Sequence, residues 1–488
     1  MSSFIHQLVT LSILVLLALC PHQSIQQITV QATCTYSYNY QNIYECYLVA
    51  TAPVTSTDVL EITGAHLENH TDDDVEAVLQ LVKFNTTFNG QVLQKFVNLK
   101  NLDISGRNFL DVNSNAFEVC PKLERLFLRN GQLTSLPPKM LKNCENLVYF
   151  ECWSQSLDTF PEDLFGNTIN LEEFEASSNK LTSLPEKLLQ NMQKLRKLRI
   201  GYNKLTNLNS NFLINNPNLE EVTLFNNEFQ HQDDITYALN GHPNLKELWI
   251  NDNKFTNFDF RFFSQFQKLE TLIISLESNS KLTGISWHSL PASLTELRVY
   301  TIGEEIPENA FERLVRLTSL SMSGTGFENL HKDMFKPLTS LVSLFIAESS
   351  LKVLHPDLFA NQINLSHLVI RNSQIQELPP GIFAPLVNIG IVNKYNGIDV
   401  TSSKLRRLNA NSFGQHPHLQ SISFYDNEIN EIERGIFSKF HPNISFAGFD
   451  RNKCVSKNLS GQNLDNSTEL EQCFKNWEDA ELNSFKNK

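Results

Sequence analysis

Two consecutive stretches of this 488-residue chain decide its fold: LEEFEASSNKLTSL from Leu171 and LRKLRIGYNKLTNL from Leu195. Both follow the pattern L-x-x-L-x-L-x-x-N-x-L-x-x-L, with Phe174 and Ala176 at two apolar positions of the first stretch. The alternating apolar residues predict a short strand with one buried face. Because the pattern returns after a fixed interval, the sequence predicts stacked repeats rather than one globular core.

The same pattern runs through most of the chain. Its leading residue recurs fourteen times at spacings of 23 to 30 residues, as Leu99, Leu123, Leu147, Leu171, Leu195, Leu219, Leu245, Leu269, Leu294, Leu317, Leu341, Leu365, Ile389 and Leu419. Val75 lies one period upstream, and Ile444 opens a last partial repeat. Strands of neighbouring repeats should pair in parallel about 4.8 Å apart. The rest of each repeat needs more room than its strand, so the stack should curve with the sheet on its inner side.

Two further columns of residues support the repeat. Asparagine at the ninth position can bond backbone groups of adjacent coils, which is what a buried polar side chain requires; these residues are Asn179, Asn203, Asn227, Asn253, Asn427 and Asn452. Phenylalanine near the end of many repeats should form a second buried column, at Phe117, Phe165, Phe263, Phe335, Phe359, Phe383 and Phe437.

The repeat resembles a known class. With Pro and Phe in its second half, as in LTSLPEKLL and IQELPPGIF, it looks like the typical 24-residue class of extracellular leucine-rich repeats, which Toll-type ectodomains share. The start, Cys34-(x11)-Cys46 followed by VLEITGAHL, is similar to secreted insect leucine-rich-repeat immune proteins, although the coiled coil of those proteins is missing here. The fold class expected is therefore an α/β-type repeat solenoid, a leucine-rich-repeat horseshoe with a parallel β-sheet on its concave face.

The N-terminus predicts secretion. The apolar run from Leu8 to Cys20 is short for a membrane span and suits a signal peptide, here taken as residues 1–27 with cleavage between 20 and 32. A retained signal anchor is the alternative. No other segment predicts a membrane span, so we expect a secreted, extracellular protein. Six Asn-x-Ser/Thr sequons are candidate glycosylation sites, at Asn69, Asn85, Asn364, Asn443, Asn458 and Asn466.

The repeats also set the domain organisation. We expect an N-terminal cap with a degenerate first repeat over 28–98, the repeats over 99–443, a C-terminal cap over 444–473 and a polar tail over 474–488. Solenoid ends expose core, so a disulfide in each cap is expected. The expected pairs are Cys34–Cys46 and Cys454–Cys473 in the caps, and Cys120–Cys144 between adjacent repeats. Two reduced thiols are the alternative for the last pair. Cys152 replaces a leucine-type position and is expected to be a free, buried core residue.

Catalysis finds no support in the sequence. It contains no GxSxG, HExxH, Walker A, dinucleotide or CxxC motif, and we expect neither an enzyme nor a cofactor. The nearest approach to a metal site is His66-x3-His70 followed by Asp72-Asp73-Asp74, which we interpret as a solvated polar loop rather than a metal site. A formal net charge of −13 disfavours nucleic acid and anionic membranes as partners.

The residues between the buried strand positions should point into the concave space. Aromatic and arginine side chains on a rigid surface are typical of interfaces, and we expect ligand binding by Arg129, Trp153, Tyr202, Phe225, Trp249 and Tyr300. The alternative is that these aromatic residues only pack against one another across the sheet.

The function expected is recognition of an extracellular protein or a microbial surface ligand through the concave or flanking surface. The family resemblance suggests innate immunity. The alternative is an adhesion or matrix component that self-associates. The ligand and the oligomeric state do not follow from the sequence.

Overall fold

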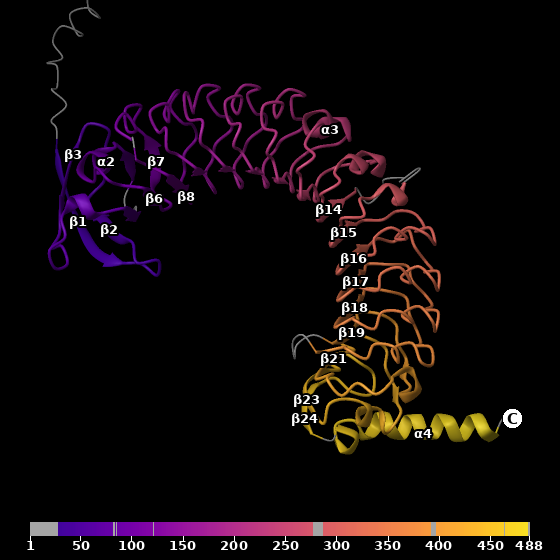
Figure 1. Cartoon of the computed structure of the whole chain (residues 1–488). Coiled ribbons are helices and arrows are strands. Elements are labelled where there is room, and N and C mark those ends of the chain that lie inside the picture. The colour runs from indigo at the N-terminus through magenta and orange to yellow at the C-terminus, as the bar shows by residue number, and fades with distance from the viewer. Residues whose placement is uncertain are drawn as a thin grey trace, which may run out of the picture. The chain divides into compact units, whose positions relative to one another are not determined.

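The computed structural model describes residues 28–81, 83, 85–120, 122–276, 286–391, 397–462 and 464–486. The proposed signal peptide, 1–27, lies outside the described residues. The chain divides into two compact units, residues 1–171 and 172–488, which we describe separately. In each unit the chain winds through successive coils whose strands pair side by side (Figure 1).

The first unit begins with an antiparallel hairpin of β1 and β2, and β3 pairs in parallel with β1. From β2 the sheet continues in parallel through β4, β6, β8 and β9. The strands of this sheet are β1 (Thr29–Tyr38), β2 (Tyr44–Ala50), β3 (Val59–Thr63), β4 (Ala77–Leu81), β6 (Asn101–Ser105), β8 (Arg125–Arg129) and β9 (Tyr149–Glu151). The remaining elements of the unit are η1 (Asp72–Asp74), β5 (Thr86–Phe88), α2 (Gln91–Lys95) and β7 (Phe109–Val112).

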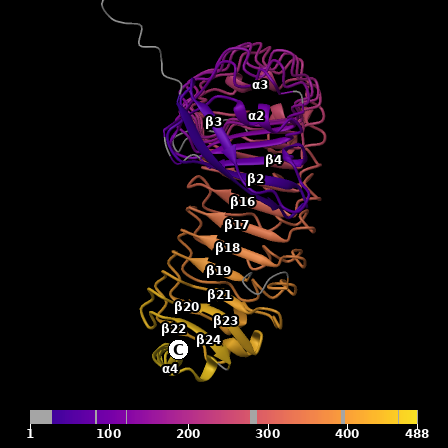
Figure 2. The ribbon, with the colours of Figure 1, turned by 90° about the vertical axis from the view of Figure 1, so that its left-hand side faces the viewer.

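The second unit carries one parallel sheet from β10 to β23, closed by the antiparallel strand β24. Figure 2 shows β16 to β19 stacked one after another. The strands are β10 (Glu173–Glu175), β11 (Lys197–Arg199), β12 (Glu221–Thr223), β13 (Glu247–Trp249), β14 (Thr271–Ser275), β15 (Glu296–Tyr300), β16 (Ser319–Ser323), β17 (Ser343–Ala347), β18 (His367–Arg371), β19 (Ile398–Thr401), β21 (Ser421–Ser423), β23 (Asn443–Gly448) and β24 (Asn458–Gln462), with β20 (Arg407–Leu408) and β22 (Glu431–Ile432) as a separate pair.

The second unit also contains helices: short ones between its strands, and two, η6 and the 16-residue α4, that follow the last strand. They are α3 (Asp233–Leu239), η2 (Phe260–Gln265), η3 (Trp287–Ser289), η4 (Ala410–Ser412), η5 (Ile436–Lys439), η6 (Leu464–Asn466) and the C-terminal α4 (Glu471–Lys486). Helix α3 follows the two-residue insertion near His231, and it buries Ile235 and Leu239. The predicted solenoid with a parallel sheet is confirmed.

The buried columns explain why every coil has the same path. Each leading leucine of the repeats is at most 2% exposed, so each coil contributes the same side chain to one continuous core. The asparagine column forms the expected ladder. Asn203 Nδ2 donates to the carbonyl oxygens of Ile200, Gly201 and Ala176, and its Oδ1 accepts from Leu181 N at 3.1 Å. The phenylalanine column is buried as well, and in the second unit the rings of Phe311, Phe335, Phe359 and Phe383 stack at centroid distances of 6.2, 6.1 and 6.4 Å.

One repeat departs from the expected register. A regular strand begins two residues after the leading residue, whereas β19 begins at Ile398, nine residues after Ile389. Ile398 pairs with Leu368 on one side and Ile422 on the other. Pairing with β18 and β21 therefore sets the position of β19. The extra residues of this repeat precede β19 in the sequence, and an insertion before a strand costs little free energy.

Disulfides lie at both ends of the chain. The structure joins Cys34 to Cys46 between β1 and β2, and Cys454 to Cys473 in the C-terminal region. Cys120 and Cys144, from adjacent coils, are joined with their Cα atoms 5.0 Å apart. Cys152 is buried. Helix α4 runs across the boundary expected between the C-terminal cap and the polar tail at 473/474. Cys473 and Phe474 are buried near its start, and this packing fixes the helix that the polar tail continues.

Candidate functional site

The exposed face of each parallel sheet is the candidate site. In the first unit, strand pairing aligns its side chains into three rows. The first is Glu45, Ala77, Asn101, Arg125 and Tyr149; the second is Tyr47, Leu79, Asp103, Phe127 and Glu151; the third includes Ser105 and Arg129. In the second unit a row of Glu173, Lys197, Glu221, Glu247, Thr271 and Glu296 lies beside one of Glu175, Arg199, Thr223, Trp249, Ile273 and Arg298. The residues that face outward are therefore mainly charged and aromatic.

Arg129, a predicted site residue, is held in a cluster of acids. Its Nε and Nη2 donate to the two carboxylate oxygens of Glu151 at 2.6 and 3.0 Å, and Nη1 donates to Asp103 at 3.3 Å. Its guanidinium also lies 4.2 Å from the Phe127 ring centre. Burial opposes the charged guanidinium, but the hydrogen bonds and charge of Glu151 outweigh this and raise the pKa of Arg129. Arg129 is therefore an internally paired cation.

Asp103 responds differently to the same cluster. Burial raises the pKa of its carboxyl, although a hydrogen bond from Ser105 and the charge of Arg129 act to lower it. The negative charge of Glu151 adds to the increase. The cluster thus combines two acids, Glu151 and Asp103, with one base, Arg129.

Two more groups complete this face of the first unit. The Arg125 guanidinium lies 4.4 Å from the Tyr149 ring centre and 5.5 Å from that of Phe127. Trp153, another predicted site residue, is 38% exposed. These side chains can offer flat apolar surface and a cation to a partner.

The second unit repeats the arginine cluster. Arg199 donates from Nε and Nη2 to Glu221 at 2.5 and 2.8 Å, and from Nη1 to Glu173 at 3.5 Å. Burial opposes its charge, but Glu221 and Glu173 raise the pKa of Arg199. On β13, next to the strand of Glu221, the pKa of Glu247 is raised, first by burial and then by the charge of Glu221.

Three predicted residues of the second unit lie together. The rings of Tyr202 and Phe225 meet edge to face at 5.0 Å, and Phe225 and Trp249 follow at 6.0 Å. A Cβ on Gly201 would lie 2.7 Å from the Phe225 ring, so the ring needs a glycine in that position. Tyr202 remains 51% exposed. The three rings, which we call the aromatic ladder, both pack against one another and present an edge to solvent.

Tyr300 lies apart from the aromatic ladder. It belongs to β15, in register with Ser275 of β14. Its half-buried side chain has no ring contact with the aromatic ladder among the described residues. The six predicted residues thus fall into an Arg129–Trp153 group of the first unit, the aromatic ladder of the second unit, and Tyr300.

The loop that carries the histidines of the N-terminal cap is polar and largely exposed, as expected, and its histidines also pack against tyrosines. His66 stacks on Tyr36 at 4.0 Å, and its Nε2 lies 3.1 Å from Asp72 Oδ1. Lys95 Nζ donates to the other oxygen of Asp72 at 2.8 Å. Burial works against the Asp72 carboxylate, but Lys95 and His66 hold its pKa below the ordinary value. The loop is fixed because tyrosines from β1 and β2 cover it.

A second histidine cluster, Glu308, His331 and Asp333, has side chains close enough to hold a metal ion. However, His331 Nδ1 accepts a hydrogen bond from Asp333 N, and His355 does the same with Asp357 N. In other repeats the carboxamide of Asn209 caps the turn in this way, by accepting from Asn211 N. We therefore interpret the His331 cluster as a turn cap.

The sequons were predicted as candidate glycosylation sites, and such a site needs an accessible asparagine. All six sequon asparagines are exposed. Asn364 Nδ2 also donates to Thr339 O at 2.8 Å, so its side chain takes part in the packing of adjacent coils. Among the described residues, no helix is long and apolar enough to span a membrane.

The comparisons with known proteins concern mainly the repeats. Residues 79–180, 177–287, 276–390 and 304–441 match the model of the BspA-type leucine rich repeat region. A search of curated proteins gives no significant match.

Three solved structures are similar in fold. A leucine-rich-repeat protein of Leptospira interrogans is 21% identical, with a TM-score of 0.53 over 75% of this chain and 96% of that one. Toll of Drosophila, solved in complex with Spatzle, is 15% identical, with a TM-score of 0.53 over 84% of this chain and 64% of Toll. The APL1 leucine-rich repeat domain is 14% identical, with a TM-score of 0.51 over 84% and 91%.

Proposed function

Because this chain belongs to the family with the BspA-type leucine-rich repeat region, we propose that it is a secreted recognition protein that binds an extracellular protein or microbial ligand. The observation that carries the proposal is the aromatic ladder on a rigid parallel sheet. Tyrosine, tryptophan and arginine dominate the energetics of known interfaces, and preorganised rings lose little freedom on binding. The function proposed is binding, not catalysis.

The aromatic ladder is proposed as the main contact surface of the second unit. Tyr202 offers an exposed ring, and Phe225 and Trp249 support it. In the first unit the proposed contact is Trp153, and the paired Arg129 serves to hold the neighbouring Phe127 in place. Tyr300 remains a proposed peripheral contact.

Several features support an extracellular location. Disulfides persist in oxidising compartments, and three are formed here. The six exposed sequons agree with passage through the secretory route. The Toll–Spatzle complex is called a molecular hub in Drosophila development and innate immunity, and a role in innate immunity is proposed for this chain on its likeness to Toll.

One observation favours the adhesive alternative. Two residues before the leading leucine, the flank of the second unit carries exposed apolar side chains at Val315, Ile363 and Val387, which are 52, 52 and 50% exposed. Ile363 and Val387 lie in register on successive coils and Val315 lies two coils before Ile363, and such an apolar row could pair with a second copy. Light scattering after size exclusion tests this possibility. Assembly that rises with concentration and is lost in Ile363→Glu would favour adhesion over soluble recognition.

Affinity capture from native extracellular fluid tests the main proposal. Wild-type protein is compared with Tyr202→Ala/Trp249→Ala, and Val353→Ala, at an exposed position, is the matched control. We expect a partner that the control retains and whose binding to the double variant is weakened by about thirtyfold or more, because one hot-spot aromatic residue contributes about 2 kcal/mol or more. Equal capture by all three proteins would remove the aromatic ladder from the proposal, and capture of no partner would contradict recognition itself.

A further inference from the structure

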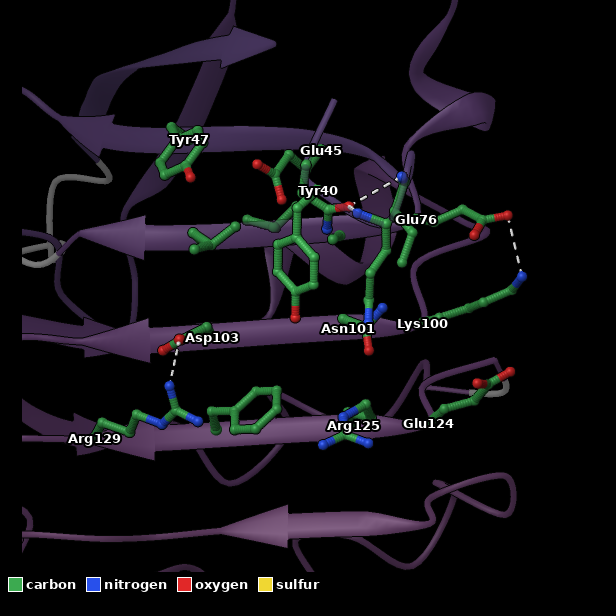
Figure 3. A pocket seen from close by; sticks show the side chains of 17 residues that line it. Tyr40, Glu45, Tyr47, Glu76, Lys100, Asn101, Asp103, Glu124, Arg125 and Arg129 are labelled. Atoms are coloured by element: carbon green, nitrogen blue, oxygen red, sulfur yellow. Dashed lines mark hydrogen bonds and ion pairs between the residues drawn. The ribbon is translucent and has the colours of Figure 1, made fainter. Parts of the chain in front are cut away.

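A hollow of about 730 Å³ opens on the exposed sheet face of the first unit. The turn between β1 and β2 overhangs it, and Tyr40 at the tip of this turn stands in front of strands β2 to β8 (Figure 3). The floor is low because the first row carries two short side chains, Ala77 and Asn101, between Glu45 and Arg125. The hollow thus results from side-chain size in one row of the sheet.

Glu45 forms the wall of the hollow beneath the turn. Its residue is only 4% exposed, and Ser37 Oγ donates to its carboxylate at 3.4 Å. No lysine, arginine or histidine nitrogen among the described residues lies within 4.0 Å of this carboxylate. A carboxylate withdrawn from water without a cation nearby is costly.

The other partly buried acids of the hollow are paired. Glu76 accepts from Lys100 Nζ at 3.1 Å, and Asp103 accepts from Arg129 at 3.3 Å. Glu45 therefore differs from its neighbours in lacking a cation. Its charge also reaches the adjacent ring, because Glu45 is the main cause of the raised pKa of Tyr47.

Aromatic side chains surround this carboxylate and remain open to solvent. Tyr40 is 95% exposed and Tyr47 is 46% exposed. Exposed rings beside an acid attract a cation through both the ring face and the charge. The formal net charge of −13 would also steer a basic partner toward the protein.

We propose that this hollow receives a lysine or arginine side chain from a basic segment of a protein partner, with Glu45 as its counter-ion and Tyr40 and Tyr47 against its aliphatic stem. The inference rests on the proposed recognition function and names the partner's chemistry at a second surface, separate from the aromatic ladder. Since the hollow opens along the sheet face, neighbouring residues of the partner can lie on Phe127 and Arg125.

The test measures binding of a fluorescein-labelled octapeptide of alternating lysine and glycine by fluorescence anisotropy. The variants are Glu45→Gln and Tyr40→Ala. Glu312→Gln is the matched control, because it removes one negative charge from an exposed acid of the second unit. We expect Glu45→Gln to weaken binding about tenfold and Glu312→Gln less than about twofold, the difference between a buried charge pair and screened surface charge.

The thermal midpoint separates binding from folding. A buried carboxylate without a cation destabilises the free protein, so Glu45→Gln should keep or raise the thermal midpoint while it weakens binding of the peptide. A lowered midpoint would show that Glu45 has a structural partner and would overturn the proposal. Equal peptide binding by wild type and Glu45→Gln would overturn it as well, as would equally tight binding of N-acetyl-lysine methylamide, which would indicate a small amine.

This outcome is distinct from failure of the proposed function. If affinity capture finds a partner that Glu45→Gln retains in full, the proposed recognition function is supported and the proposal that the hollow binds a basic segment is overturned. If Glu45→Gln no longer binds the captured partner or the lysine peptide, both the recognition function and the proposed binding of a basic segment are supported.

Discussion

The two units carry the same arginine cluster, built at different places in the repeat. Arg129 pairs with an acid 22 residues later and another 26 residues earlier, and Arg199 has the same spacings to Glu221 and Glu173. In both cases the guanidinium spans two neighbouring strands and makes a bidentate pair with one acid. Because Arg129 and Arg199 are already paired with acids, the side chains proposed to bind a ligand are the aromatic ones near them: Trp153 in the first unit and the aromatic ladder in the second.

The units differ in their buried titratable groups. In the first unit, burial raises the pKa of Asp103. In the described part of the second unit, burial lowers the pKa of three histidines, His242, His367 and His416. Acid should therefore weaken the second unit around these histidines, whereas protonation of Asp103 favours the folded state of the first unit around β6 and β8. The lowered pKa of Asp72 in the first unit and the raised pKa of Glu247 in the second act in the opposite sense, each around its own residue.

The largest effect expected is acid destabilisation of the second unit. Burial lowers the pKa of His416 to about 4. The unfolded chain takes up a proton near pH 6.5, whereas folded His416 stays neutral, so the free energy of unfolding falls as the pH drops from 6.5 to 4. The loss is about 3 kcal/mol for this group.

Hydrogen exchange at matched chemical exchange rates can locate the loss. Protection of β21 and β22 should fall between pH 7 and pH 5, whereas protection of β6 and β8 should hold, because a raised carboxyl pKa favours the folded state in acid. His416→Phe should flatten the response. An equal loss of protection at β6 and β8 and at β21 and β22 would contradict the assignment of the acid sensitivity to the buried histidines of the second unit.

Breaking the arginine clusters should have the next largest effect. Arg129→Met leaves Glu151, whose side chain is 10% exposed, without its cation, and Arg199→Met does the same to Glu221 at 12%. We expect each to lower the free energy of unfolding by about 2 kcal/mol in denaturant titration.

Two further variants make this measurement specific. Arg129→Met/Glu151→Gln should be closer to wild type than Arg129→Met alone, because no carboxylate is then stranded. Arg261→Met, at a side chain 73% exposed, should leave the free energy of unfolding nearly unchanged, because a solvent-exposed ion pair contributes little to stability. If Arg261→Met costs as much as Arg129→Met, burial of the acid is not the cause.

The smallest effect expected is on the aromatic ladder. Phe225→Leu removes the ring that contacts Tyr202 and Trp249, and should lower the free energy of unfolding by about 1 kcal/mol. Gly201→Ala should displace the same ring, since its Cβ would lie 2.7 Å away. Tryptophan fluorescence of both variants should shift in the same direction, and an unchanged spectrum for Gly201→Ala would show that the ring does not depend on the glycine.

In the N-terminal cap the sequence did not predict which side chains contact one another. The segment around His66 is the polar loop that the sequence predicts, but nothing in the sequence places Tyr36 and Tyr44 over its histidines. The sequence also did not single out Tyr40 and Glu45, which line the hollow proposed as a second contact surface. The one available signal was the pairing of Cys34 with Cys46, which places the turn between β1 and β2 and puts Glu45 opposite Ser37.

The sequence by itself determined the repeat, the buried leucine, asparagine and phenylalanine columns, and the residues that face outward. This was possible because each coil repeats the same local pattern and contacts mainly its neighbours. The tertiary structure decided which outward residues meet. Arg129 and Arg199 pair with acids two residues out of register on the neighbouring strands, because their long side chains extend diagonally across the sheet. Glu45 has no cation beside it, because the turn between β1 and β2 lies over it. A 24-residue period carries no information about either.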